Sequence, residues 1–120
     1  MEENPKKKYD LEERCFVFAR DTRFFVKNLP RSVSNLEDIK QLVRASGSIG
    51  ANYIEANESL GQKDFLMRIK ISRKEAKESA FWLRLLSTGT NTSVDKERDR
   101  LVQEATELML ILSTIMRRTR

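Results

Sequence analysis

Apolar residues recur at steps of three and four along most of the chain, which is the spacing of one face of an α-helix. The first stripe predicts a helix that ends at Pro30, because proline cannot continue a helix. Its members are Leu11, Cys15, Phe18, Thr22 and Phe25. The second stripe predicts a helix over about residues 35–57. Its members are Ile39, Leu42, Ser46, Ile49 and Tyr53.

Two further stripes predict a third helix over about residues 63–88 and a fourth helix near the C-terminus. The third stripe is Phe65, Ile69, Ser72, Ala76, Ser79, Leu83 and Leu86. The fourth is Leu101, Ala105, Leu108, Leu112 and Ile115, with Val102, Met109 and Met116 beside it. Gly47 and Gly50 each cost the second helix about 1 kcal/mol relative to alanine. We therefore expect a neighbouring backbone to approach there, with the small residues of the third helix facing these glycines.

Short polar patterns mark the expected helix ends. A serine or threonine that precedes an acidic or amide residue by three positions can cap a helix start. Such patterns are Ser34-x-x-Glu37, Ser59-x-x-Gln62 and Thr92-x-x-Asp95. Asp10 is the expected N-cap of the first helix, and Gly89 is placed to end the third.

Four amphipathic helices joined by short links favour antiparallel neighbours. The sequence thus predicts an all-α, up-down-up-down four-helix bundle over residues 9–118, after a mobile basic arm at residues 1–8. This topology would gather basic residues that are far apart in sequence at one end of the bundle. They are Lys6, Lys7, Lys8, Lys63, Arg117, Arg118 and Arg120. Solvated chain ends, with the last arginines complementing a helix dipole, are the alternative.

The charge balance suggests a class of partner. The chain has 23 basic and 18 acidic residues and a net charge of +5, which favours RNA, DNA or an acidic membrane surface. Glutamates interrupt the basic residues of the third helix, which are Arg68, Lys70, Arg73, Lys74, Lys77 and Arg84. The expected phosphate contacts among them are Arg68, Arg73 and Lys77. A bound nucleic acid would meet such residues through its phosphates, with little base readout. The same charge could instead serve solubility.

Catalytic chemistry finds no support in the residue types. The chain has no histidine, which removes the commonest general base and transition-metal ligand. Cys15 is the only cysteine; it reads as a small buried hydrophobe in a reducing, cytoplasmic setting. No apolar run approaches the roughly 20 residues of a membrane span. We expect no enzyme activity, no metal, no cofactor and no small-molecule substrate.

Polar residues flank the predicted core on the second and third helices. Unpaired buried polar groups cost about 1–3 kcal/mol each, so these residues need partners. We expect Arg44 to meet Glu75 or Glu78, and Asn52 to meet a serine or a backbone group. The predicted network comprises Gln41, Arg44, Asn52, Glu55, Glu75 and Glu78. A ligand site is the alternative use of these side chains.

Several of these segments resemble a bacterial family known as four helix bundle proteins. The matching motifs are residues 9–12, 41–49, 52–55 and 65–86, and the resemblance covers about residues 8–116. The founding members of this family are encoded in 23S rRNA intervening sequences. Tyr53 stands where the family often has isoleucine, and Ala56 where it usually has glycine. These departures affect the end of the second helix rather than the fold.

The resemblance implies an antiparallel bundle that assembles as a homopentamer. Sister copies would then cover the surplus apolar positions Phe16, Val17, Phe24, Val102 and Met109. A related group, the accessory proteins of diversity-generating retroelements, implies binding to nucleic acid and to a reverse transcriptase. The leading hypothesis is an oligomer that binds RNA or DNA through basic surface residues. The rival hypothesis is a protein–protein scaffold or adaptor without nucleic-acid binding.

Overall fold

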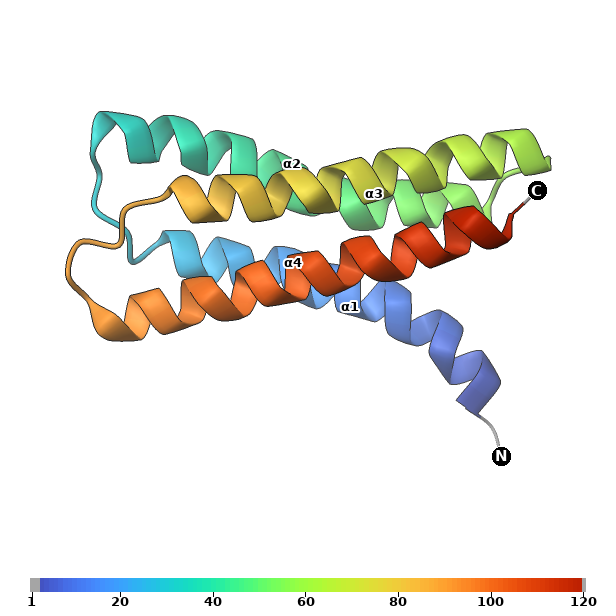
Figure 1. The fold of residues 1–120 in the computed structure, drawn as a ribbon, viewed down its shortest axis with the longest axis horizontal. Coiled ribbons are helices and arrows are strands. Elements are labelled where there is room, and N and C mark those ends of the chain that lie inside the picture. Colours follow the sequence, from blue (N-terminus) through green and yellow to red (C-terminus); the bar gives the residue numbers. More distant parts are fainter. Residues whose placement is uncertain (1–2, 120) are drawn as a thin grey trace.

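The computed structural model describes the backbone of residues 3–119 and the side chains of residues 11–119. Four helices make up this part of the chain (Figure 1). They are α1 (Glu3–Val26), α2 (Val33–Asn57), α3 (Gln62–Leu85) and α4 (Thr92–Arg118). Residues 3–119 contain no strand. The all-helical prediction is confirmed.

The helices pack against one another over a longest dimension of 46 Å. The α1–α2 and α3–α4 links lie at one end, and the α2–α3 turn and the end of α4 lie at the other (Figure 1). The first turns of α1 extend away from the other helices. The helix begins at Glu3, so Asp10 does not start it, and residues 3–8 are helical where we expected an arm. The mobility of that segment stays a prediction.

The predicted apolar stripes form the core between the helices. All five members of the α1 stripe are buried, and in the other stripes only Ile39, Phe65 and Ile115 are partly exposed. Val102, Met109 and Met116 are half-buried against the same core. Phe16 and Phe24 point outward and keep 60% and 55% of their surface exposed. The surplus apolar surface of α1 is therefore unpaired within one copy.

The two glycines of α2 face α1 rather than the small residues of α3. A Cβ at Gly50 would lie 3.1 Å from Cys15 Cβ, and a Cβ at Gly47 would lie 3.2 Å from Arg23 Nη2. The expected close approach exists, but we assigned it to the wrong helix. The small residues of α3 do approach α2 nearby, since Ser72 Oγ donates to Ile49 O at 2.7 Å.

Three helix starts differ from the predicted capping patterns. Ser32, not Ser34, caps α2 by accepting from Asn35 N at 3.2 Å. Gly61 stands at the N-cap of α3, and Ser59 instead donates to Glu55 O. Asn91, not Thr92, caps α4 by accepting from Ser93 N and Val94 N. In each case a neighbouring residue has the extended backbone that an N-cap requires.

The links at one end of the bundle are joined by a buried amide. Asn35 Nδ2 donates to Pro30 O at 2.9 Å and to Ser87 O at 2.8 Å, and its Oδ1 accepts from Ser87 N at 3.0 Å. These bonds fix the chain just after α3, which ends at Leu85 rather than near residue 88. Gly89 has a φ of +70° and turns the link instead of ending the helix.

Candidate nucleic-acid interface

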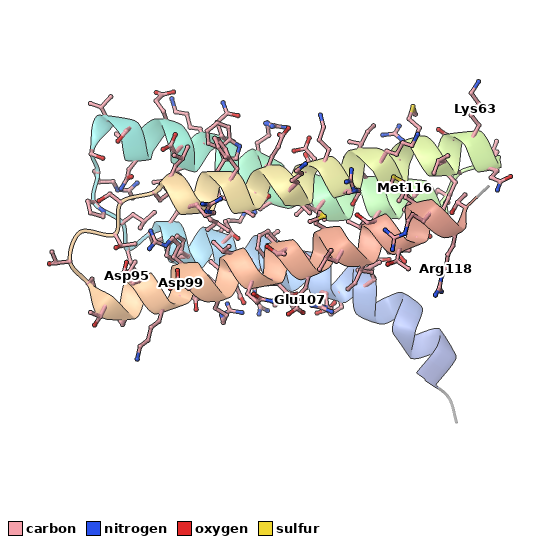
Figure 2. All side chains as sticks on the ribbon, in the orientation of Figure 1. Lys63, Asp95, Asp99, Glu107, Met116 and Arg118 are labelled. Atoms are coloured by element: carbon pink, nitrogen blue, oxygen red, sulfur yellow. The ribbon has the colours of Figure 1, made fainter. Side chains whose placement is uncertain are left out.

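The outer face of α3 carries a row of cations. Lys63, Lys70, Lys77 and Arg84 follow one another at seven-residue intervals, and Lys74 lies among them. Each interval of seven residues rises about 10.5 Å, so the row covers about 32 Å. We call these five residues the α3 stripe. All five are exposed, and Figure 2 shows Lys63 pointing away from the bundle.

The heptad spacing of α3 separates this stripe from the core. Ile69, Ala76 and Leu83 also recur every seven residues, and all three are fully buried. Seven residues make nearly two full turns, so each row stays on its own side of the helix. Burial of the apolar row against α2 and α4 therefore directs the cationic row to solvent.

Little negative charge compensates the α3 stripe. Lys74 Nζ lies 3.9 Å from Glu75 Oε2. No carboxylate of residues 11–119 lies within 4.0 Å of the other four cations. The stripe therefore presents net positive charge along the length of α3.

The cations between α1 and α4 are paired instead. Arg14 donates to Glu104 at 2.8 and 3.0 Å and to Glu107 at 3.1 Å. Arg100 donates to Glu97 at 2.7 and 2.9 Å and to Asp21 at 3.0 Å. We call these six residues the α1–α4 seam. The hydrogen bonds raise the pKa of Arg14 and of Arg100 above their already high usual values.

Two arginines predicted to contact phosphates serve helix packing. Arg68 Nη1 donates to Asn52 Oδ1 of α2 at 3.1 Å. Arg73 Nε donates to Ser113 Oγ of α4 at 2.7 Å. The two arginines lie on opposite sides of the exposed face of α3, and each bonds to a different neighbouring helix. Lys77, which we also predicted, belongs to the exposed stripe.

The predicted basic end is divided between two sides of the molecule. Lys63 and Arg118 lie at the same end of the bundle but point in opposite directions (Figure 2). Arg117 is exposed beside Arg118 in the last turn of α4. The side chains of Lys6, Lys7 and Lys8, and all of Arg120, lie outside the described residues. Lys63 and Arg118 thus do not form one compact cluster.

Part of the predicted polar network is present between α2 and α3. Arg44 Nη1 lies 3.6 Å from Glu75 Oε2, which is the ion pair that the sequence predicted. Asn52 donates to Ser48 O at 2.9 Å within α2, besides accepting from Arg68. Glu75 is only 7% exposed, and its Oε1 has no hydrogen-bond partner among the described residues.

The other three members of that network have no such role in the described structure. The side chains of Gln41, Glu55 and Glu78 make no hydrogen bond to another described residue. Gln41 and Glu55 are exposed, and Glu78 is half-buried. Their sequence spacing placed them near the α2–α3 contact, but spacing alone does not give them a partner there.

The described residues contain few reactive groups that could act together. Among residues 11–119, no three histidine, cysteine or acidic side chains gather as a metal ion would require. Cys15 is buried, and loss of solvation raises the pKa of its thiol to about 12. None of the helices in the described part of the chain is long and apolar enough to cross a membrane.

Sequence reasoning noted the basic residues of α3 but did not separate the exposed α3 stripe from the basic residues that bond to neighbouring helices. The predicted contacts included Lys63 and Lys77 but omitted Lys70, Lys74 and Arg84. The seven-residue spacing of Lys63, Lys70, Lys77 and Arg84 could have identified this row. Residues at this spacing share one solvent-facing side of a helix, whereas Arg68 and Arg73 lie beside it.

Fold and surface together define a small helical bundle protein with a cationic face along α3. Its sequence identifies the family. Residues 7–114 match the family described as 23S rRNA-intervening sequence protein, and the chain belongs to that family. The resemblance stated from the sequence motifs is therefore confirmed.

The chain is similar to individual proteins, of which we describe two. The first is a solved structure from Bacteroides thetaiotaomicron VPI-5482, described as a protein with unknown function from the S23 ribosomal protein family. It superposes with a TM-score of 0.76 at 28% identity, covering 88% of this chain and 97% of that one. The second is centromere protein S of Bos taurus, 34% identical over 61 residues. The chain matches 44% of that protein, less than half its length.

Proposed function

We propose that the protein is a non-enzymatic, cytoplasmic oligomer that binds RNA or DNA through phosphate contacts. The observation that carries the proposal is the α3 stripe, whose five exposed cations extend over about 32 Å. Unpaired surface cations attract a polyanion and release its condensed counterions. The family name, which refers to an insertion in ribosomal RNA, supports a nucleic-acid setting.

The α3 stripe replaces some of the phosphate-contacting residues that we expected from the sequence. Lys63 and Lys77 remain in it, joined by Lys70, Lys74 and Arg84. Arg68 and Arg73 hold α3 against its neighbours, so we assign them no phosphate. The basic chain ends remain a second proposed contact. They comprise Lys6, Lys7, Lys8, Arg117, Arg118 and Arg120.

A filter-binding titration against structured RNA across a salt series tests the proposal. We expect the plot of log affinity against log salt to slope downward. Replacing Lys70, Lys77 and Arg84 by glutamine should make the slope shallower by about two, because each lost phosphate contact contributes about 0.7 to 0.9. The matched control replaces Lys27, Lys40 and Lys96, three exposed lysines elsewhere, by glutamine.

Both triple variants remove the same charge from the net +5, so only position distinguishes them. Retention of the wild-type slope in the control and its loss in the stripe variant would support the assignment. Equal losses would show that net charge alone drives binding. Binding of the wild type with no salt dependence would overturn the proposal.

We also propose that the up-down-up-down bundle assembles into a homopentamer. The exposed Phe16 and Phe24 on α1 support self-association, since large apolar side chains at a surface favour burial. Light scattering should give about 70 kDa for five copies of 14.0 kDa. A 14 kDa species at micromolar concentration would contradict it.

One observation favours the scaffold alternative. A hollow of about 650 Å³ lies between α1 and α2. Its apolar and small lining residues include Phe16, Ala19, Gly50 and Ile54, and its charged ones are Glu12, Glu13, Arg20 and Arg23. A partner helix could occupy such a groove. Affinity purification with and without nuclease separates the two functions, because a scaffold retains its protein partner after nuclease treatment.

A further inference from the structure

We infer that Phe81 is a base-stacking platform and that the ligand of the α3 stripe is a single-stranded nucleic acid. Phe81 lies four residues after Lys77 and three before Arg84, so it shares their face of α3. Its side chain is 52% exposed. The inference rests on the proposed function and names its ligand class.

The ring of Phe81 is held in place from one side. Its centroid lies 5.1 Å from the Trp82 ring at an interplanar angle of 73°, an edge-to-face contact. Trp82 is half-buried and packs against the core. Phe81 is therefore braced by a residue that is itself fixed, and a braced aromatic side chain loses little freedom when a base stacks on it.

The other exposed phenylalanines lack these surroundings. Lys27 Nζ lies 5.4 Å above the Phe24 ring, so a cation already covers that face. Phe16 lies in the α1–α2 hollow, whose charged lining is mixed: Glu12 and Glu13 stand beside Arg20 and Arg23. The described residues place no cation over Phe81, and the nearest stripe residues on each side are positive. Glu78, half-buried one turn earlier, is the acidic neighbour on its own helix.

A single strand uses this combination better than a duplex does. Proteins that bind single strands combine a positive track for the backbone with aromatic side chains for the bases. In a duplex the base faces are covered by their neighbours, so an aromatic ring at the surface has nothing to stack on. Phe81 lies near the Arg84 end of the stripe, on the face where a duplex backbone would offer its ring no base to stack on.

Trp82 provides a direct measurement, because it is the only tryptophan in the chain. We would titrate the full chain with oligouridylate of about twelve nucleotides and with an RNA duplex of the same length, following Trp82 fluorescence and anisotropy. We expect tighter binding of the single strand and a change in Trp82 emission. Phe81→Leu should weaken single-strand binding about tenfold, the effect of losing one aromatic face.

Leu110→Ala is the matched control, because it removes an apolar side chain of similar exposure, 56%, on α4 rather than on α3. Its affinity should equal that of the wild type. The salt slope of Phe81→Leu should also be unchanged, since stacking releases no counterions. Circular dichroism of both variants confirms that they fold.

The outcomes separate this inference from the proposed function. If Phe81→Leu binds like the wild type while the Lys70, Lys77 and Arg84 variant fails, stacking is wrong and the phosphate track stands. Preference for the duplex would also overturn the single-strand assignment. If neither RNA binds at any salt concentration, the proposed function itself fails.

Discussion

The α1–α4 seam and the α3 stripe both place cations along a helix, but they use the charge in opposite ways. In the seam, Arg14 and Arg100 each contact two carboxylates at hydrogen-bonding distance. In the stripe, Lys63, Lys70 and Lys77 have no carboxylate of residues 11–119 within 4.0 Å. The seam cations hold α1 and α4 together, whereas most of the stripe cations have no carboxylate partner in the described structure.

The difference separates residues that bond to one another across two helices from residues that we propose for binding. An arginine with two carboxylates gains charge-assisted hydrogen bonds in a fixed geometry. Like charges one helical turn apart, such as Lys70 and Lys74, oppose each other by about 0.2–0.5 kcal/mol. The stripe therefore costs the helix some stability, which a structural role alone would not explain.

The largest stability effect is expected from breaking the seam. Arg14→Gln should lower the free energy of unfolding by about 1 kcal/mol, the upper range for a partly exposed pair with bidentate geometry. Lys77→Gln should change it by less than about 0.5 kcal/mol, as expected for an exposed residue without contacts. Urea unfolding followed by circular dichroism measures both. Equal effects of the two substitutions would remove the distinction between seam and stripe.

Acid should weaken the seam while leaving the charge of the stripe unchanged. The hydrogen bond from Gln103, and then that from Arg14, lowers the pKa of Glu107 (labelled in Figure 2) below its ordinary value. The folded state thus binds its proton less readily than the unfolded state. The stabilising contribution is present above the unfolded pKa of about 4.3 and is lost as the pH falls through the lower folded value.

The comparison of wild type with Glu107→Gln tests this pH dependence. We expect the wild type to have the higher urea midpoint at pH 7 and the difference to shrink as the pH falls below about 4.3. The effect should be smaller than that of Arg14→Gln, because Arg14 keeps its two bonds to Glu104. A difference that persists at low pH would mean that the Glu107 carboxylate does not provide it.

The core could be predicted from sequence because burial follows helical periodicity. Leu11, Cys15 and Phe18 recur on one face, and the structure buries all three. Helix starts were harder, since Ser32 and Ser34 have equal capping chemistry and the backbone entering α2 chooses between them. The partner of Gly50 was also beyond reach, because a close approach identifies a small residue but not the helix that approaches it.

The surface was predicted less well, for a different physical reason. Arg68 and Lys70 are both basic and only two residues apart, yet Arg68 bonds to Asn52 while Lys70 faces solvent. Their side chains leave the axis of α3 about 160° apart, because each residue turns the helix by about 100°. Which of the two faces solvent therefore depends on the position of the buried row. Composition does not contain that angle. The Arg44–Glu75 pair was accessible because both residues flank the apolar stripes.

The smallest change in stability is expected for Lys77→Glu. It distinguishes stripe from seam most clearly, because the free energy of unfolding should rise while RNA affinity falls. Lys77→Glu places a carboxylate four residues after Arg73 and three after Lys74. Two repulsions then become attractions, and the free energy of unfolding should rise by about 0.2–0.5 kcal/mol. RNA affinity should fall further than in Lys77→Gln, because the new charge repels phosphate where the old one attracted it. Urea unfolding and the salt-series titration measure the two quantities on the same preparation. A loss of stability would contradict self-repulsion in the stripe, and unchanged affinity would remove Lys77 from the interface.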